Sequence, residues 1–344
     1  MVALQQNYEQ SSQCRHWRFS RAKLHEIRRA TNQSGIERAR ANIAAEKDEL
    51  HQQQTQPAPD SQDDTAVNYL TLEDELALCH FYETRIETVS KYFKFPNQVK
   101  ATAVVFMKRF FLYNTVMDYP PKFIMLTCLY LATKTENHFI QIEEFAKPST
   151  LKTTPKDILD YEFIVSQSLK FEFTIHHPYS PLYGFFLDAQ AVVDNMALLT
   201  QVYNKAMEWC HKSLFTDLVF LYFPSQVALA AMLLAAQDVG WDFDTYLTYK
   251  FTEPVPRQEL VTILTDIAAI LKAYQPITVT TVRDIDRKLI YCRNPEKDPS
   301  SLLYQKKLQQ AEDAEDQRRL AKVPAKPPST ESESVAEGEG GLVD

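Results

Sequence analysis

The sequence predicts an all-α protein of two tandem five-helix repeats with extra N- and C-terminal helices. The first observation is the segment from Pro121 to Glu136, PKFIMLTCLYLATKTE, which is apolar or small at nearly every position from Phe123 to Ala132. A helix with no polar face lies among other helices or in lipid, and this one is much shorter than the ~20 apolar residues that a membrane crossing needs. We therefore expect a buried central helix whose C-terminal end presents Lys134 to something outside.

The second observation is that this segment occurs twice. Pro224 to Asp238, PSQVALAAMLLAAQD, aligns with it without a gap when Pro224 is placed on Pro121. The aligned pairs are Phe106 with Trp209, Leu112 with Phe215, Val116 with Val219, Tyr119 with Tyr222, Ile124 with Val227, Leu126 with Leu229, Leu131 with Leu234 and Ala132 with Ala235. Self-similarity of this kind indicates repeated structural units, and chance matching of apolar residues is the alternative. Lys134 aligns with Gln237, so a lysine at this position is not a requirement of the repeat.

Composition excludes several classes of protein. With 344 residues the chain is long enough for two domains. A net charge of −8 argues against a general nucleic-acid coat. The five cysteines are odd in number and widely spread, which indicates a reducing compartment and no clustered zinc site. The first residues, MVALQQNYEQ, lack the apolar core of a secretory signal, so we expect the cytosol or the nucleus.

Nothing in the sequence indicates an enzyme. The chain has only six glycines, too few and too scattered for a phosphate-binding loop. His176-His177 is the only histidine pair, and we interpret it as a polar corner between the two units rather than a metal site. Glu143-Glu144 is interpreted as a solvated face, because adjacent helical residues point apart. We predict no catalytic residue, no cofactor and no metal ligand.

Residues 1–50 are predicted to form an N-terminal helical extension. An apolar stripe beside basic residues is formed by Trp17, Phe19, Leu24 and Ile27. Ser20 is a plausible N-cap for the first helical segment, and a break is expected at Asn32–Gly35. The spacing of Arg21 and Leu24 also resembles a destruction box, but the final Asn of that motif is missing, so a helix stripe explains it better. We expect this stripe to serve a complex rather than the fold of the two units.

The remaining elements follow from punctuation by proline and from apolar spacing. Residues 51–68, rich in glutamine, proline and acid, are predicted to be a linker. The first unit spans 69–175, with helices from Thr71 to Phe93, Gln98 to Val116, Pro121 to Glu136, Ile140 to Lys147 and Pro155 to Lys170. The second spans 176–275, with helices starting at Pro181 and then covering Leu198 to Phe223, Pro224 to Val239, Phe243 to Tyr249 and Arg257 to Tyr274. C-terminal helices are expected in 276–321 and a disordered acidic tail in 322–344.

This pattern resembles the cyclin family. The residues that carry the resemblance are Leu131-Ala132-Thr133-Lys134 at the end of the buried helix, Glu162 in the fifth helix, and the exit Phe171-x-Phe173. Two further motifs resemble the cyclin H group within that family, namely Arg15-His16-Trp17-x-Phe19-Ser20 and Leu221-Tyr222-x-Pro224-Ser225-Gln226. The resemblance covers roughly Ser12 to Cys292.

The resemblance implies a regulatory subunit without catalysis of its own. Cyclins press the αC helix of a cyclin-dependent kinase inward, which completes an ion pair needed for phosphoryl transfer. By position, Lys134 and Glu162 would hydrogen-bond the kinase backbone ahead of αC, and Phe171 and Phe173 would supply apolar contact. The cyclin H group further implies a nuclear CDK-activating kinase complex with a RING-containing assembly factor, part of general transcription factor IIH. That complex would phosphorylate kinase activation loops and the RNA polymerase II C-terminal repeats, with no direct contact to nucleic acid or membrane.

Departures from the family and other interpretations remain. Cell-cycle cyclins carry an M-R-x-I-L docking patch where this chain has Glu75-Leu76-Ala77-Leu78, and many have Asp-Arg where it has Lys108-Arg109. Another transcriptional cyclin is one alternative. A transcription-factor-IIB-like protein, which binds DNA and polymerase through the same kind of repeat, is a second. A helical scaffold that activates no kinase is a third.

Overall fold

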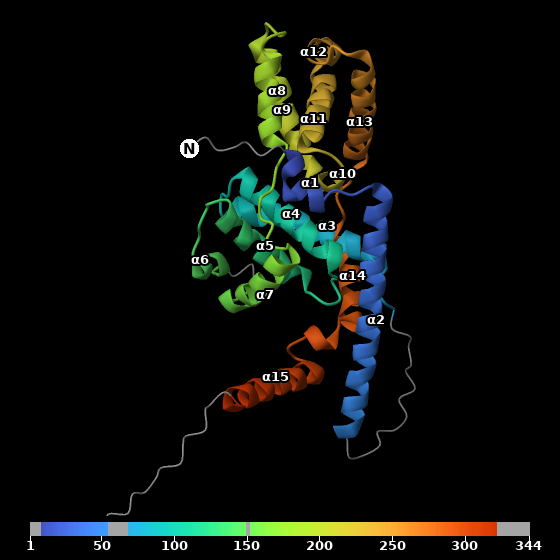
Figure 1. The fold of residues 1–344 in the computed structure, drawn as a ribbon, viewed down its shortest axis with the longest axis vertical. Coiled ribbons are helices and arrows are strands. Elements are labelled where there is room, and N and C mark those ends of the chain that lie inside the picture. The colour runs from blue at the N-terminus through green and yellow to red at the C-terminus, as the bar shows by residue number, and fades with distance from the viewer. Residues whose placement is uncertain (1–7, 54–67, 149–151, 322–344) are drawn as a thin grey trace, which may run out of the picture.

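The structure is a computed structural model that describes residues 8–53, 68–148 and 152–321. These residues form helices and contain no strand, in two helical units with additional helices at both ends (Figure 1), which confirms the predicted fold class. The first unit comprises α3 (Leu72–Tyr92), α4 (Asn97–Tyr113), α5 (Pro121–Thr135), α6 (Ile142–Ala146) and α7 (Pro155–Ser168). The second comprises α8 (Tyr179–Ala189), α9 (Met196–Ser213), α10 (Leu218–Leu221), α11 (Pro224–Val239), α12 (Phe243–Lys250) and α13 (Pro254–Ala273).

The two repeated segments are the central helices of the two units. In α5 every residue from Ile124 to Thr133 is buried, and α3, α4 and α7 pack around it. In α11 the buried residues contact α8, α9 and α13. Each helix starts with proline at its first position, where the missing N–H costs nothing. At its other end α11 stops at Gly240, whose φ of 82° is the left-handed conformation that glycine adopts without strain.

The second unit contributes residues to the core of the first. Leu214 and Phe215 follow α9 and are buried among side chains of α3 to α7. The chain therefore turns after Ser213, and only the short α10 precedes Tyr222. The predicted continuous helix from Leu198 to Phe223 is wrong for this reason. Its apolar pattern is helical throughout, but residues 214–217 form turns that insert into the neighbouring unit.

The N-terminal extension forms η1 (Tyr8–Gln10), α1 (Ser12–His16) and a single helix, α2 (Arg21–Gln53), that runs along the first unit (Figure 1). The predicted break at Asn32–Gly35 is wrong. The Asn32 side chain donates to the carbonyl oxygen of Leu70 at 3.1 Å and to Glu75 Oε2 at 3.0 Å. Residues that locally favour a loop are used here for tertiary contact. Since α2 continues to Gln53, the predicted linker 51–68 begins inside the helix, and its residues 54–67 lie outside the described residues.

At Gly35, α2 packs closely against the first unit. A Cβ atom at this position would lie 2.6 Å from Cγ2 of Thr115, a buried, β-branched side chain that cannot swing away. We expect Gly35→Ala to lower the free energy of unfolding by about 1–3 kcal/mol, the usual cost of overpacking. Thermal and denaturant unfolding measure it. Gly184→Ala in α8 is the matched control, because nothing lies within 4 Å of its Cβ. That control should gain up to about 1 kcal/mol from helix propensity, and equal effects of the two substitutions would contradict the assignment.

The C-terminal helices pack back onto the N-terminal part of the chain. From α14 (Val279–Cys292), Val282, Ile285 and Leu289 join a small core with Leu70 and Leu78. After η2 (Pro295–Lys297), α15 (Leu302–Ala321) contacts the far end of α2, where Lys306 Nζ lies 2.5 Å from Glu49 Oε1. The predicted tail 322–344 lies outside the described residues. None of the described helices is long and apolar enough to cross a bilayer.

Candidate functional site

Lys134 and Glu162 lie together at the end of the central helix. Lys134 lies in the last turn of α5 and Glu162 lies on the neighbouring α7. The Lys134 ammonium donates a hydrogen bond to the Glu162 carboxylate. The Lys134 Nζ also lies 4.4 Å from the centre of the Tyr130 ring. The two side chains are 36% and 24% exposed, so both charged groups are reachable from solvent. The pair is thus already held in place in the free chain.

The second unit has a different pair at the corresponding place. Gln237 on α11 accepts a hydrogen bond from Lys272 Nζ on α13 at 3.2 Å. A polar contact therefore joins α5 to α7 in the first unit and α11 to α13 in the second, but the lysine lies on the central helix in the first unit and on the other helix in the second. The repeat requires a contact here and does not require this ion pair.

Phe171 and Phe173 follow α7 and have different surroundings. The Phe171 side chain is 57% exposed and lies 6.3 Å from Phe163, which is itself 67% exposed on α7. Phe173 packs on the core of the first unit, with its ring 6.0 Å from that of Phe106. The Phe171 side chain thus faces solvent, whereas the packed Phe173 side chain attaches the same segment to the core of the first unit.

An exposed apolar face lies beside the ion pair, and sequence reasoning did not identify it. Leu159 and Phe163 are one turn apart on α7, next to Glu162, and are 43% and 67% exposed. Contiguous exposed apolar side chains mark interaction surfaces. The signal was present in the spacing, because these two residues lie off the buried stripe of Ile158 and Val165.

The N-terminal stripe faces the core of this chain. Trp17 and Leu24 are 1% and 3% exposed and cluster with Leu112 and Phe220. Phe19 and Ile27 pack against the same cluster. The expectation that this stripe serves a complex rather than the fold is therefore wrong. Its two most buried side chains, those of Trp17 and Leu24, are covered by other residues of the same chain.

A group of polar contacts ties Trp17 to the segment after α7. The Trp17 indole donates to Glu172 Oε2 at 2.6 Å, and His16 Nδ1 lies 2.5 Å from Glu172 Oε1. The Arg109 guanidinium stacks 4.6 Å from the Trp17 ring centre and donates to the Glu172 backbone carbonyl at 3.0 Å. Burial lowers the pKa of Arg109 to about 9, against the opposing effect of the Glu172 carboxylate, so the group stays charged at neutral pH.

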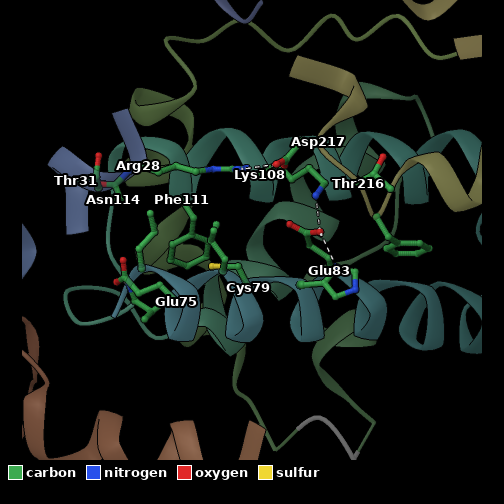
Figure 2. Close-up of a pocket in the computed structure, with 15 residues that line it drawn as sticks. Arg28, Thr31, Glu75, Cys79, Glu83, Lys108, Phe111, Asn114, Thr216 and Asp217 are labelled. Atoms are coloured by element: carbon green, nitrogen blue, oxygen red, sulfur yellow. Dashed lines mark hydrogen bonds and ion pairs between the residues drawn. The ribbon is translucent and has the colours of Figure 1, made fainter. Parts of the chain in front are cut away.

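A cavity of about 200 Å³ lies where α2, α3, α4 and residues 215–217 meet (Figure 2). Arg28 donates to both carboxylate oxygens of Asp217 at 2.7 and 2.6 Å, and Lys108 lies 2.7 Å from Glu83. Burial alone would raise the pKa of Asp217, but the hydrogen bonds and the charge of Arg28 outweigh it and keep that pKa below its ordinary value. The charged side chains that line the cavity therefore pair with one another. The Arg28–Asp217 pair joins α2 to the second unit, and the Lys108–Glu83 pair joins α4 to α3.

The histidine pair lies in the connector between the units. The His177 ring is 2.8 Å from Thr102 Oγ1, and burial, helped by His176 and Arg109, lowers the pKa of His177 to about 3. It is therefore neutral in the folded chain. In the described part of the chain no three His, Cys, Asp or Glu side chains gather as a metal site.

Comparison with known families assigns both halves of this fold. The family of the cyclin N-terminal domain matches residues 48–174, and that of the cyclin C-terminal domain matches residues 177–272. The chain belongs to the cyclin family. Its relatives at 29–35% identity include proteins named cyclin H, which confirms the resemblance to that group.

Three similar proteins cover most of this cyclin. Cyclin mcs2 of Schizosaccharomyces pombe is 33% identical over 306 residues, which is 87% of this chain and 89% of that protein. A chain in the structure of the CAK complex from Chaetomium thermophilum bound to ATP-γ-S is similar with a TM-score of 0.73 and 26% identity, covering 95% of this chain and 98% of that one. A chain of the yeast TFIIK (Kin28/Ccl1/Tfb3) complex is similar with a TM-score of 0.60 and 32% identity, covering 77% and 100%.

Proposed function

We propose that this cyclin is the regulatory, non-catalytic subunit of a CDK-activating kinase in general transcription factor IIH. The observation that carries the proposal is its similarity, over nearly the whole of both chains, to a chain of a CAK complex. Similarity to a chain of the TFIIK complex supports the link to transcription. A RING-containing assembly factor as third subunit and a nuclear location belong to the same proposal.

The kinase-binding surface proposed here consists of Lys134, Glu162, Phe163, Phe171 and Phe173. An ammonium has three N–H donors and a carboxylate several acceptor positions. Lys134 and Glu162 can therefore bond each other and still bind backbone carbonyls and N–H groups of a kinase. Such charge-assisted bonds are about twice as strong as neutral ones. The exposed Phe163 and Phe171 would be covered in the complex, which removes water from around the ion pair.

The activity follows from positioning. A kinase whose αC helix is held inward keeps its catalytic Lys–Glu pair and its Mg²⁺-binding Asp in place. The cyclin supplies a rigid surface for αC and contributes no group to phosphoryl transfer. The proposed substrates are activation loops of other kinases and the C-terminal repeats of RNA polymerase II.

The test is reconstitution with a kinase of the CDK-activating type. Phosphorylation of an activation-loop peptide and of a C-terminal-repeat peptide is measured with and without the full-length cyclin. We expect a stable complex and a rise in rate for both peptides. Absence of a complex would favour a helical scaffold. A mobility shift of promoter DNA by the cyclin alone would favour a protein like transcription factor IIB.

A further inference from the structure

The segment that displays Phe171 has an unfavourable backbone. Lys170 and Phe171 have φ values of 56° and 57°, so two consecutive non-glycine residues are in the left-handed region. This conformation is sterically disfavoured for residues with a side chain and persists only when surrounding contacts hold it. Within the segment, the Phe171 N–H donates to the Ser166 carbonyl and the Lys170 N–H to the Gln167 carbonyl, both at 2.9 Å.

Residues between Gln13 and Trp17 contact this segment both before and after Phe171 in the sequence. Downstream of Phe171, the Glu172 carboxylate accepts from the Trp17 indole and lies against His16. Upstream, Lys170 Nζ lies over the Trp17 ring at 5.5 Å. We call these contacts the N-terminal clasp.

A second contact with the N-terminal residues lies further along the connector, the segment between α7 and α8. The Gln13 side chain accepts from the His176 N–H at 2.7 Å and donates to the His176 carbonyl at 3.2 Å. A side-chain amide that bonds both backbone groups of one residue fixes that residue as a strand partner would. The connector from Lys170 to His176 is therefore held at both ends, by residues of α1 and by Trp17 directly after it.

The clasp is itself anchored. Trp17 is 1% exposed, and the buried Arg109 of α4 stacks on its ring. The Phe19 N–H donates to the Phe220 carbonyl in the second unit at 2.8 Å. The residues of the clasp are thus packed on α4 of the first unit and, through the neighbouring Phe19, bonded to α10 of the second.

We infer that Glu172 is a positioning residue for kinase binding: its carboxylate, bonded to Trp17 and His16, keeps the Lys170–Phe171 backbone in the conformation that displays Phe171. The inference rests on the proposed function, because it assumes that Phe171 meets a kinase. Glu172 needs no contact with the kinase for this role. If its loss leaves the binding-competent conformation only a tenth populated, the apparent Kd rises about tenfold.

The experiment compares Glu172→Ala with a matched control in the second unit. The Trp209 indole donates to Asp238 Oδ2 at 2.8 Å, the same type of bond at a distance from the connector. Full-length variants are measured for kinase Kd, for hydrogen exchange of the Phe171 and Glu172 amides, and for Tm. We expect Glu172→Ala to raise Kd about tenfold and to speed exchange at these amides by a similar factor. Asp238→Ala should leave the kinase Kd and the exchange rates at their wild-type values. Glu172→Gln should give values between those of the wild type and Glu172→Ala, since it keeps an acceptor for the indole.

Each outcome decides between the two proposals. Wild-type binding with an unchanged Kd for Glu172→Ala overturns the positioning role and leaves the proposed function intact. A wild-type chain that binds no kinase overturns both. Should Glu172→Ala fail to fold, Trp17→Phe replaces it, because phenylalanine keeps a six-membered aromatic ring in the buried position and removes the indole N–H together with the rest of the five-membered ring. An unchanged Kd for that variant then overturns the inference.

Discussion

Replacing Trp17 by alanine is expected to lower the free energy of unfolding by about 3–5 kcal/mol, the range for a fully buried tryptophan. The side chain is 1% exposed and fills the space among Leu24, Leu112 and Phe220. Its removal leaves a cavity and also strips the Arg109 guanidinium of the ring that covers it. The Glu172 carboxylate loses its indole donor at the same time. The measurement is chemical denaturation of the full-length chain.

The control is Tyr291→Ala, an aromatic truncation at a side chain that is 74% exposed. It should change stability by less than about 0.5 kcal/mol.

By the same argument, removal of residues 1–50 should destabilise both units and not merely weaken a complex. A truncated chain that melts like the full-length protein would contradict the packing of the N-terminal helices described above.

The architecture was predictable because it depends on local pattern. The all-round apolar character of α5 and α11, with proline at the first position of each, is visible in the residues of each helix alone. Their gapless alignment then implied two units of one design. Such features need no knowledge of what packs against the helix.

The errors arose where tertiary contacts outweigh local preference. Asn32 and Gly35 favour a loop locally, yet one bonds Leu70 and Glu75 and the other admits Thr115, so α2 passes through them unbroken. Residues 214–217 continue an apolar helical pattern but turn, because Leu214 and Phe215 complete the core of the other unit. Neither contact can be read from a window of neighbouring residues.

The candidate site was predictable only in part. The resemblance to cyclins selected Lys134 and Glu162, but not the fact that they bond each other in the free chain. The contact of Trp17 with Glu172 joins residues 155 positions apart, and no local signal indicates it. Glu172 lies between Phe171 and Phe173, and nothing in the neighbouring sequence indicates that its carboxylate has a partner. Its role becomes visible only from the position of α1 and Trp17 in the structure.

Kinase binding is expected to fail when Lys134 is replaced by glutamate. The new carboxylate would face the backbone carbonyl oxygens of the kinase, and loss of one partner of a charged hydrogen bond at an interface commonly costs about 2–5 kcal/mol. Stability should fall by no more than about 1 kcal/mol, because the ion pair with Glu162 is partly exposed and such pairs contribute little to folding. Co-purification with the kinase, peptide phosphorylation and Tm are the measurements. Glu162→Lys should behave in the same way.

The charge-swapped variant Lys134→Glu/Glu162→Lys separates a role in folding from a role in binding. It restores an ion pair between α5 and α7, so its Tm should return toward that of the wild type. Kinase activation should remain lost, because the donor and the acceptor now occupy each other's places and face like groups on the kinase backbone. Gln237→Glu in the second unit is the control, since its new carboxylate meets Lys272 and should leave activation unchanged. If the charge swap restored activation together with stability, the pair would be needed for the fold alone, and the kinase would have to bind elsewhere on this cyclin.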